Sequence, residues 1–306
     1  MEELRELVGA ERRLRWRAKF QPSLFTFNQY SPREWGVPTY YRPETLPVNP
    51  PVIAIVTPSF NQGAFIGRTI QSVLDQQYPA LRYTVQDGGS SDATIAELHK
   101  YGDQLSWVSA RDDGQAHAIN LGFSRVEGEI MGWLNSDDTL LPGTLAYIAN
   151  FFHDHPEIDF VYGHRIFVDV NDKDVGRMIL PQHDREAIKY FDFIPQETMF
   201  WRRRAWEKLG GVDASFKFAM DWDFILRAHE AGFRFRRLPR FLGCFRVHNA
   251  QKSSSWTDIE MVESTRLRRR THGRTLEGSE VTKAAGPYYR RHILTVRAYK
   301  LGLVRF

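Results

Sequence analysis

The chain has 306 residues, of which 42% are hydrophobic and 25% are charged, and this ordinary globular composition excludes a protein dominated by disorder. A formal net charge of +4 selects no class of partner by itself. The single cysteine, Cys244, excludes an intramolecular disulfide and a cysteine-based zinc cluster, and it is typical of a reducing compartment.

The N-terminal segment, residues 1–50, is expected to form an extension of the main domain. Its first twenty residues are highly charged and carry apolar residues at helical spacing, which predicts a helix and argues against a signal peptide. No stretch of the chain approaches the roughly 18 consecutive apolar residues of a membrane span. We therefore expect a cytoplasmic protein, with peripheral contact to the inner face of a membrane left open.

Strands and helices alternate along residues 51–138. The β-branched run at 51–60 predicts a buried strand, and the apolar face of 64–77 predicts a helix. Further along the chain we expect strands within 83–91, 105–110 and 129–138, and helices at 91–102 and 115–126. This order predicts an α/β fold with a mostly parallel central sheet, right-handed crossovers and flanking helices.

The second half of the chain has a less regular pattern. We expect strands within 159–170 and 195–203, a helix at 220–233 and an extended basic segment at 233–248. The main domain is expected to cover residues 51–255.

Residues 256–306 are expected to form a basic helical C-terminal extension. Beyond Glu280 this segment contains six lysines and arginines and no acid, and its cationic and apolar residues recur at roughly helical spacing. The pattern fits a helix on an anionic membrane surface, and equally a helix packed on the domain with its basic face in solvent.

Polar clusters follow four of the expected strands. They are the sequences TPSFNQG, QDGGSSD, ARDDGQ and NSDD. In parallel α/β sheets, ligands bind beyond the carboxyl ends of the strands. Four polar strand ends on one edge therefore indicate a binding site.

Two of these strand ends carry acidic residues suited to a ligand. Asp137 and Asp138 repel each other unless a cation offsets their charge, and a hard divalent cation prefers carboxylate oxygens; the alternative is that Asp138 caps a helix or forms an Asx turn. Asp87 precedes two glycines that allow close approach, so it could accept from a nucleobase or a ribose hydroxyl. The alternative for this segment is a turn with Ser91 or Asp92 as helix N-cap.

Later residues add a candidate base and a candidate metal ligand. Asp221 and Asp223 stand at a helix start and point in different directions, so one can face a cleft and act as a general base. Both could equally be carboxylates that the helix dipole favours. His248 could bind a metal or a phosphate, with Arg246 and Lys252 adding positive charge, or it could be an ordinary surface or core histidine.

Taken in order, these motifs resemble those of an inverting glycosyltransferase of family 2 with the GT-A fold, over residues 51–255. The matching segments are IAIVTPSFNQGAFIGRTIQSVLDQQYP, VQDGGSSDAT, RDDGQAHAINLGF, GEIMGWLNSDD, GGVDASFKFAMDWDFILR and FRVHNAQKSS. Each segment is weak alone, and the ordered series is specific.

The resemblance implies roles for individual residues. Asp221 matches the catalytic base, Asp137 matches the metal-binding carboxylate of the family's DxD site, and His248 matches a late histidine that joins the metal or the diphosphate. The positions expected to hold the nucleotide are Thr57, Pro58, Ser59, Asn61, Asp87, Arg111, Asp112 and Ser136. Those expected on the acceptor side or in support of the site are Trp133, Asp138, Gln196, Glu197, Trp222 and Asp223.

Two positions depart from the family's pattern. Asn135 replaces the first aspartate of DxD, so Asp137 must supply more of the attraction for the metal. Met220 stands where the family often has a glutamate before the base. Asp221 itself is retained, and neither change argues for an inactive protein.

The function that this resemblance implies is sugar transfer with Mn²⁺ or Mg²⁺ as cofactor. The expected donor is a nucleoside-diphosphate sugar, UDP-linked by preference, and the expected acceptor is a hydroxyl of a glycan or a lipid-linked glycan. No nucleic-acid partner is expected. A dinucleotide-dependent oxidoreductase would need a G-x-G-x-x-G turn, which TPSFNQG is not, whereas a non-catalytic nucleotide-sugar sensor remains an alternative.

Overall fold

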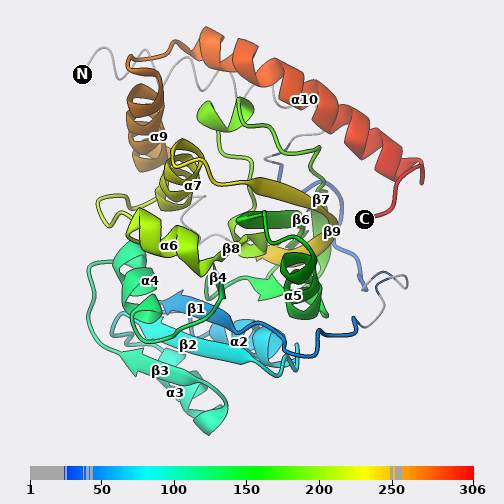
Figure 1. Cartoon of the computed structure of the whole chain (residues 1–306). Coiled ribbons are helices and arrows are strands. Elements are labelled where there is room, and N and C mark those ends of the chain that lie inside the picture. Colours follow the sequence, from blue (N-terminus) through cyan, green and yellow to red (C-terminus); the bar gives the residue numbers. More distant parts are fainter. Residues whose placement is uncertain are drawn as a thin grey trace.

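The computed structural model describes Leu24 and residues 26–36, 38, 41, 44–248, 251 and 257–306 (Figure 1). The helix expected in the first twenty residues and the charge expected from Lys252 lie outside the described residues. The division into an extension, a main domain and a second extension stays a prediction.

One mixed sheet of nine strands organises the described part of the chain, in the order β3-β2-β1-β4-β8-β6-β9-β5 with β7 beside β6. The strands are β1 (Ile53–Ser59), β2 (Leu81–Asp87), β3 (Ser106–Ser109), β4 (Ile130–Trp133), β5 (Thr139–Leu140), β6 (Phe160–Val168), β7 (Asp174–Met178), β8 (Phe200–Arg202) and β9 (Phe235–Arg246). Strands β1 to β4 pair in parallel, as do β6 and β9, whereas β8, β7 and β5 pair antiparallel. The expected α/β class with a mostly parallel core is confirmed.

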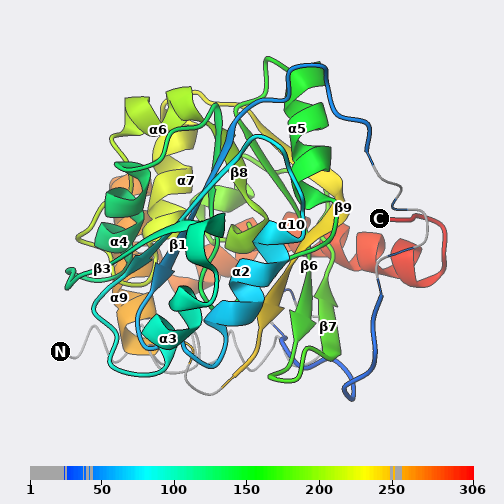
Figure 2. The same cartoon turned by 90° about the horizontal axis from the view of Figure 1, so that it is seen from below.

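Helices cover both faces of this sheet (Figure 2). They are α2 (Ile66–Leu74), α3 (Thr94–His99), α4 (Gln115–Phe123), α5 (Thr144–Asp154), α6 (Arg203–Leu209), α7 (Met220–Glu230), α9 (Thr257–His272) and α10 (Gly278–Lys300), with short 3₁₀ turns at Gly102–Gln104 (η1), Ala187–Lys189 (η2) and Gln196–Thr198 (η3). Successive side chains of β1 point to opposite faces of the sheet and belong to different hydrophobic clusters. Val56 packs with residues of α4 and α7, and Ile55 packs with residues of α2 and α5. This alternation follows from the period of two along a strand.

Two local expectations were wrong in detail. Residues 195–203, expected as a strand, begin as the turn η3, and only Phe200–Arg202 pairs in the sheet, where β8 lies antiparallel between β4 and β6. Helix α5 begins at Thr144 after Gly143, whose φ of 76° is left-handed. Asp138 therefore does not cap that helix, which removes the first alternative for it.

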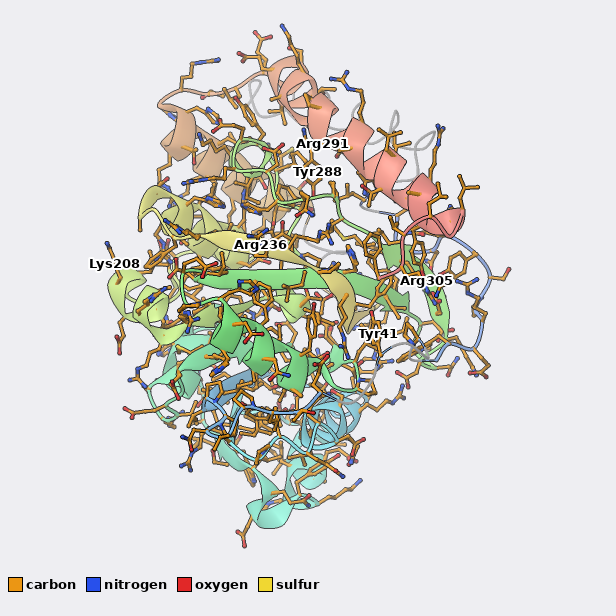
Figure 3. The ribbon with its side chains drawn as sticks, turned by 45° about the vertical axis from the view of Figure 1, so that its right-hand side comes forward. Tyr41, Lys208, Arg236, Tyr288, Arg291 and Arg305 are labelled. Atoms are coloured by element: carbon orange, nitrogen blue, oxygen red, sulfur yellow. The ribbon has the colours of Figure 1, made fainter. Side chains whose placement is uncertain are left out.

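Helix α10 crosses the molecule with one buried face (Figure 1). Ala285, Tyr288, His292 and Val296 are buried at helical spacing, and Tyr288 points from the helix toward the strands (Figure 3). The helices predicted for residues 257–300 are thus confirmed. Within the ranges that the structure describes, no helix combines the length and the apolar character needed to cross a membrane.

Candidate functional site

A cavity of about 640 Å³ opens beyond the carboxyl ends of the parallel strands. Its lining includes ten of the residues to which the resemblance assigned a role, which are Pro58, Ser59, Arg111, Asp112, Trp133, Ser136, Asp137, Asp138, Gln196 and Asp221, and it also includes Asn135 and Met220, the two departures from the family's pattern. They come from the last residues of β1 and β4, from the loops after β3 and β4, from η3 and from the start of α7. The position agrees with the edge of the sheet at which the polar strand ends were expected to meet.

The two adjacent aspartates have different environments. Asp137 keeps 20% of its side chain exposed, and its Oδ2 lies 3.0 Å from Nε2 of His248. Asp138 is 2% exposed and accepts the backbone N–H of Arg246. Burial, followed by the negative charges of Asp137 and Glu197, raises the pKa of Asp138 well above its ordinary value. Asp137 is therefore the member of the pair that is available to a ligand.

Arg246 supports the acidic turn, which is the turn that carries Asp137 and Asp138. Its side chain is buried, its Nε donates to the carbonyl of Asp137 at 2.9 Å, and its Nη1 lies 2.6 Å from a carboxylate oxygen of Asp172. The hydroxyl of Thr69 on α2 lies 2.9 Å and 2.8 Å from the carbonyl oxygens of Ser136 and Asp138. The charge expected from Arg246 for a diphosphate is thus engaged within the fold.

Asp137 and His248 suit a divalent cation. Neighbouring ligands of an octahedral metal bound at about 2.1 Å lie about 3.0 Å apart, which is the separation of these two side chains. Among the described residues, no three or more histidine, cysteine or acidic side chains are placed to hold a metal ion by themselves, so a diphosphate and water would supply the remaining positions. The oxygen of Asn135 already accepts from Gln115 Nε2 at 2.7 Å, so the side chain at the first DxD position contributes to the turn.

Three predicted nucleotide-binding residues do not belong to the lining: Asp87 and Thr57 are buried, and Asn61 is exposed. Asp87 is fully buried, and its carboxylate accepts from the backbone N–H groups of Gly89 and Ser90 and from the Ser109 hydroxyl at 2.6 Å. Asn61 has a left-handed φ of 52°, and its own N–H donates to the hydroxyl of Ser90. Both residues therefore shape the wall.

Thr57 is the third residue outside the lining. It is buried, with its hydroxyl 3.0 Å from that of Tyr83. Direct contact of Thr57, Asn61 and Asp87 with a nucleotide stays a prediction.

Because position 88 is a glycine, the backbone there can lie close to the side chain of Asp112 in the wall of the cavity. A Cβ at position 88 would lie 3.0 Å from a carboxylate oxygen of Asp112, which itself accepts the backbone N–H of Gly114. A side chain at position 88 would push Asp112 out of place. The glycine pair after β2 thus has a steric role in addition to its turn geometry.

Asp221 is the residue of its motif that faces the cavity. It stands in the first turn of α7, on the lining, and its Oδ1 accepts the backbone N–H of Trp222 at 2.9 Å. Trp222 is buried with its indole N–H on the carbonyl of Ile188, and Asp223 is buried between Arg227 and Arg270. Trp222 and Asp223 do not line the cavity.

Two buried polar atoms on the lining have no hydrogen-bond partner within the described part of the chain. They are Oγ of Ser59 and Oε1 of Gln196. The Gln196 amide nitrogen donates to the carbonyl of Trp133, which fixes the amide so that only the acceptor remains unused. Buried polar groups without partners mark places where a polar ligand can bind. Glu197, in contrast, is buried in a two-point ion pair with Arg165, away from the lining.

The sequence analysis missed a second carboxylate near Asp221. Burial and the neighbouring charge of Asp221 raise the pKa of Asp192 well above its ordinary value, and Asp192 accepts the backbone N–H of Ile194. It also missed apolar lining from Phe218 and Phe245. Asp192 lies in an irregular segment between η2 and η3, where no periodic pattern or motif indicated a site.

The fold and the cavity together are typical of an α/β enzyme, because the cavity lies between an acidic turn after a parallel strand and a carboxylate at a helix start. The model of the family described as Glycosyl transferase family 2 matches residues 54–218, more than half of the chain. The chain belongs to this family, and it is a glycosyltransferase.

Individual relatives agree with this assignment. The chain is 25% identical over 248 residues to the O-antigen biosynthesis protein RfbC of Myxococcus xanthus, a match that covers 78% of this chain and 19% of that longer protein. In fold it is similar to residues 1–349 of S. aureus TarS in complex with UDP-GlcNAc, with a TM-score of 0.59, 20% identity, and coverage of 82% and 75% of the two chains. It is also similar to the mannosyltransferase PcManGT from Pyrobaculum calidifontis in complex with GDP-Man and Mn²⁺, with a TM-score of 0.53, 18% identity, and coverage of 98% and 90%.

Proposed function

We propose that the protein is a metal-dependent inverting glycosyltransferase that moves a sugar from a nucleoside-diphosphate sugar, by preference a UDP-sugar, to a hydroxyl of a glycan or lipid-linked glycan. The proposal rests on one observation: Asp137 and Asp221 line the same cavity, and Asp137 contacts His248. One end of this lining suits a cation with a diphosphate, and the other suits an acceptor hydroxyl.

The donor half of the cavity rests on Asp137 and His248. These two side chains would hold Mn²⁺ or Mg²⁺, which when bound neutralises charge on a departing diphosphate. Arg111 and Asp112 on the same lining are the residues proposed to contact the base and the ribose. One solved neighbour is in complex with UDP-GlcNAc and the other with GDP-Man and Mn²⁺, which supports a nucleotide-sugar donor without choosing the base.

The acceptor half rests on Asp221. Its carboxylate takes the proton of an acceptor hydroxyl while the hydroxyl oxygen forms a bond to the anomeric carbon. The bond from that carbon to the diphosphate oxygen breaks with its electron pair, and the nucleoside diphosphate leaves. A single displacement from the opposite face inverts the anomeric centre, and the unused acceptor atom of Gln196 is available to a sugar hydroxyl.

A panel of nucleotide sugars distinguishes this function from that of a sensor without turnover. We expect one UDP-, GDP- or dTDP-sugar with Mn²⁺ to raise the melting temperature, since a ligand at 100 times its Kd adds about 2.7 kcal/mol of stability. We also expect that sugar to yield free nucleoside diphosphate when acceptors are added. Stabilisation without any release would favour the sensor, and the absence of both would contradict the proposal.

An exposed stripe on α10 suits an anionic membrane surface. Arg290, Leu294, Arg297 and Leu301 recur at helical spacing opposite the buried face of the helix, and Leu294 and Leu301 are 63% and 74% exposed. We propose that this stripe contacts the membrane that carries a lipid-linked acceptor.

Vesicle binding tests the stripe. The protein is expected to sediment with phosphatidylserine vesicles but not with phosphatidylcholine vesicles, and Leu294→Ser with Leu301→Ser should abolish sedimentation. Arg269→Ala, which changes an exposed arginine of α9, serves as the control. Equal sedimentation of the double variant and the parent would contradict the contact.

A further inference from the structure

Glu263, a carboxylate of α9, binds the backbone of residues 217–219, which lead into helix α7. Glu263 is 8% exposed, and its two oxygens accept the backbone N–H groups of Lys217, Phe218 and Ala219 at 2.8, 2.9 and 2.8 Å. Three consecutive backbone donors on one carboxylate make a strong, charge-assisted contact. The contact joins parts of the chain that are 44 to 46 residues apart.

This contact provides hydrogen-bond acceptors for backbone N–H groups at the start of α7. Ala219 is the N-cap of that helix and offers no side-chain cap, so the backbone donors there need acceptors from elsewhere. A negative charge at a helix N-terminus is favourable. Position 220, next to the base, holds a methionine. The carboxylate that accepts the N–H groups of residues 217–219 therefore comes from α9, whereas Asp221 accepts the N–H of Trp222 within the first turn.

The segment that Glu263 holds is a wall of the cavity. Phe218, Met220 and Asp221 all line it, and Asp221 follows Ala219 by two residues. A shift of the 217–219 backbone would thus move the carboxylate of Asp221 relative to an acceptor.

A second contact fixes the same helix two turns further along α9. Nη1 of Arg270 lies 2.5 Å from the buried carboxylate of Asp223. Between these two points, Arg268 donates to the carbonyl of Tyr190 at 2.7 Å, close to Asp192. Helix α9 therefore connects the start of α7 with the irregular segment beside the base.

We infer that Glu263 is a positioning residue, which holds the start of α7 so that Asp221 meets the acceptor hydroxyl. This inference rests on the proposed function, because it takes Asp221 as the base. It makes α9, which lies beyond the segment matched by the family model, part of the catalytic apparatus.

The test is a kinetic comparison of Glu263→Gln with the full-length parent protein, using the donor identified by the nucleotide-sugar panel. We expect kcat to fall on the order of 10²-fold, because small displacements of a catalytic group cost that much. The Kd for the donor and Mn²⁺ should stay within about twofold, since α9 makes no described contact with Asp137 or His248. Asp258→Asn, which changes an exposed carboxylate of the same helix, should behave like the parent.

A double-mutant cycle separates positioning from general support. Glu263→Gln should have no further effect on the residual rate of Asp221→Asn, because a residue that acts through the base has nothing left to position. An additive effect, or an equal loss of donor affinity, would overturn the inference. If Glu263→Gln does not fold, Glu263→Asp keeps the charge with a shorter reach and is put through the same cycle.

Failure of this inference can be told apart from failure of the proposed function. If Asp221→Asn retains transfer, the assignment of the base is wrong. If Asp221→Asn is inactive and Glu263→Gln is as active as the parent, only the positioning role is wrong.

Discussion

Asp221→Asn is expected to lower kcat for sugar transfer by about 10³-fold or more while leaving the affinity for the donor nearly unchanged. The amide keeps the shape of the carboxylate and can still accept from the backbone N–H of Trp222. It cannot take up the proton of the acceptor hydroxyl, and general base catalysis contributes about 10²- to 10⁴-fold. Release of nucleoside diphosphate in the presence of acceptor measures the rate, and calorimetry measures donor affinity.

Glu230→Gln provides a matched control, because Glu230 is an exposed carboxylate at the other end of the same helix. It should retain the parent's rate. Transfer by Asp221→Asn at a rate within tenfold of the parent would remove Asp221 as the base. Asp192 would then be the next carboxylate to test, since it lies near enough for the charge of Asp221 to raise its pKa.

Asp137→Ala is expected to abolish the Mn²⁺-dependent part of donor binding, which corresponds to a loss of about 100-fold or more. Asp137 is the exposed member of the acidic pair, and its contact with His248 is the only histidine–carboxylate contact described on this lining. Removing the charged ligand leaves the cation with too few protein donors to bind between the chain and a diphosphate.

Metal removal gives the matching measurement for this prediction. Chelation should weaken donor binding to the parent but not to Asp137→Ala, and His248→Ala should act in the same direction. Asp113→Ala removes an acid that is 92% exposed near the same loops and should leave binding unchanged. Equal donor affinity with and without Mn²⁺, in the parent and in Asp137→Ala, would contradict a metal at this position.

Local patterns were sufficient to predict the parallel half of the sheet. Strands β1 and β4 are short apolar runs followed by polar residues, and helix α2 between β1 and β2 has one apolar face. The cavity could be placed because parallel strands bring their carboxyl ends to one edge. The separation of Asp137 from Asp138 was also expected, although the metal role of Asp137 stays a prediction.

The remaining features depend on contacts between distant segments. Nothing around Glu263 distinguishes it from other acids of a charged helix, and its role depends on a loop more than 40 residues away. The local pattern around Arg246 indicates a cation for a ligand, because its partners Asp137 and Asp172 lie 109 and 74 residues earlier in the chain. Residues 195–203 have the composition of a strand, but the chain first turns at η3. Only Phe200–Arg202 then pair with neighbouring strands of the sheet.

The long strand β9 has a consequence for how the enzyme must be produced. Its end carries Arg246, which binds the acidic turn at Asp137, and two residues later comes His248. The segment recognised by the family model ends at residue 218, ahead of the proposed base Asp221 and of both of these groups. A fragment cut to this segment would keep the parallel strands β1 to β4 almost whole, together with the acidic turn, but it would lose β9. It would also lack His248 of the proposed cation site and the proposed proton acceptor, so expression trials should retain the chain at least through α9.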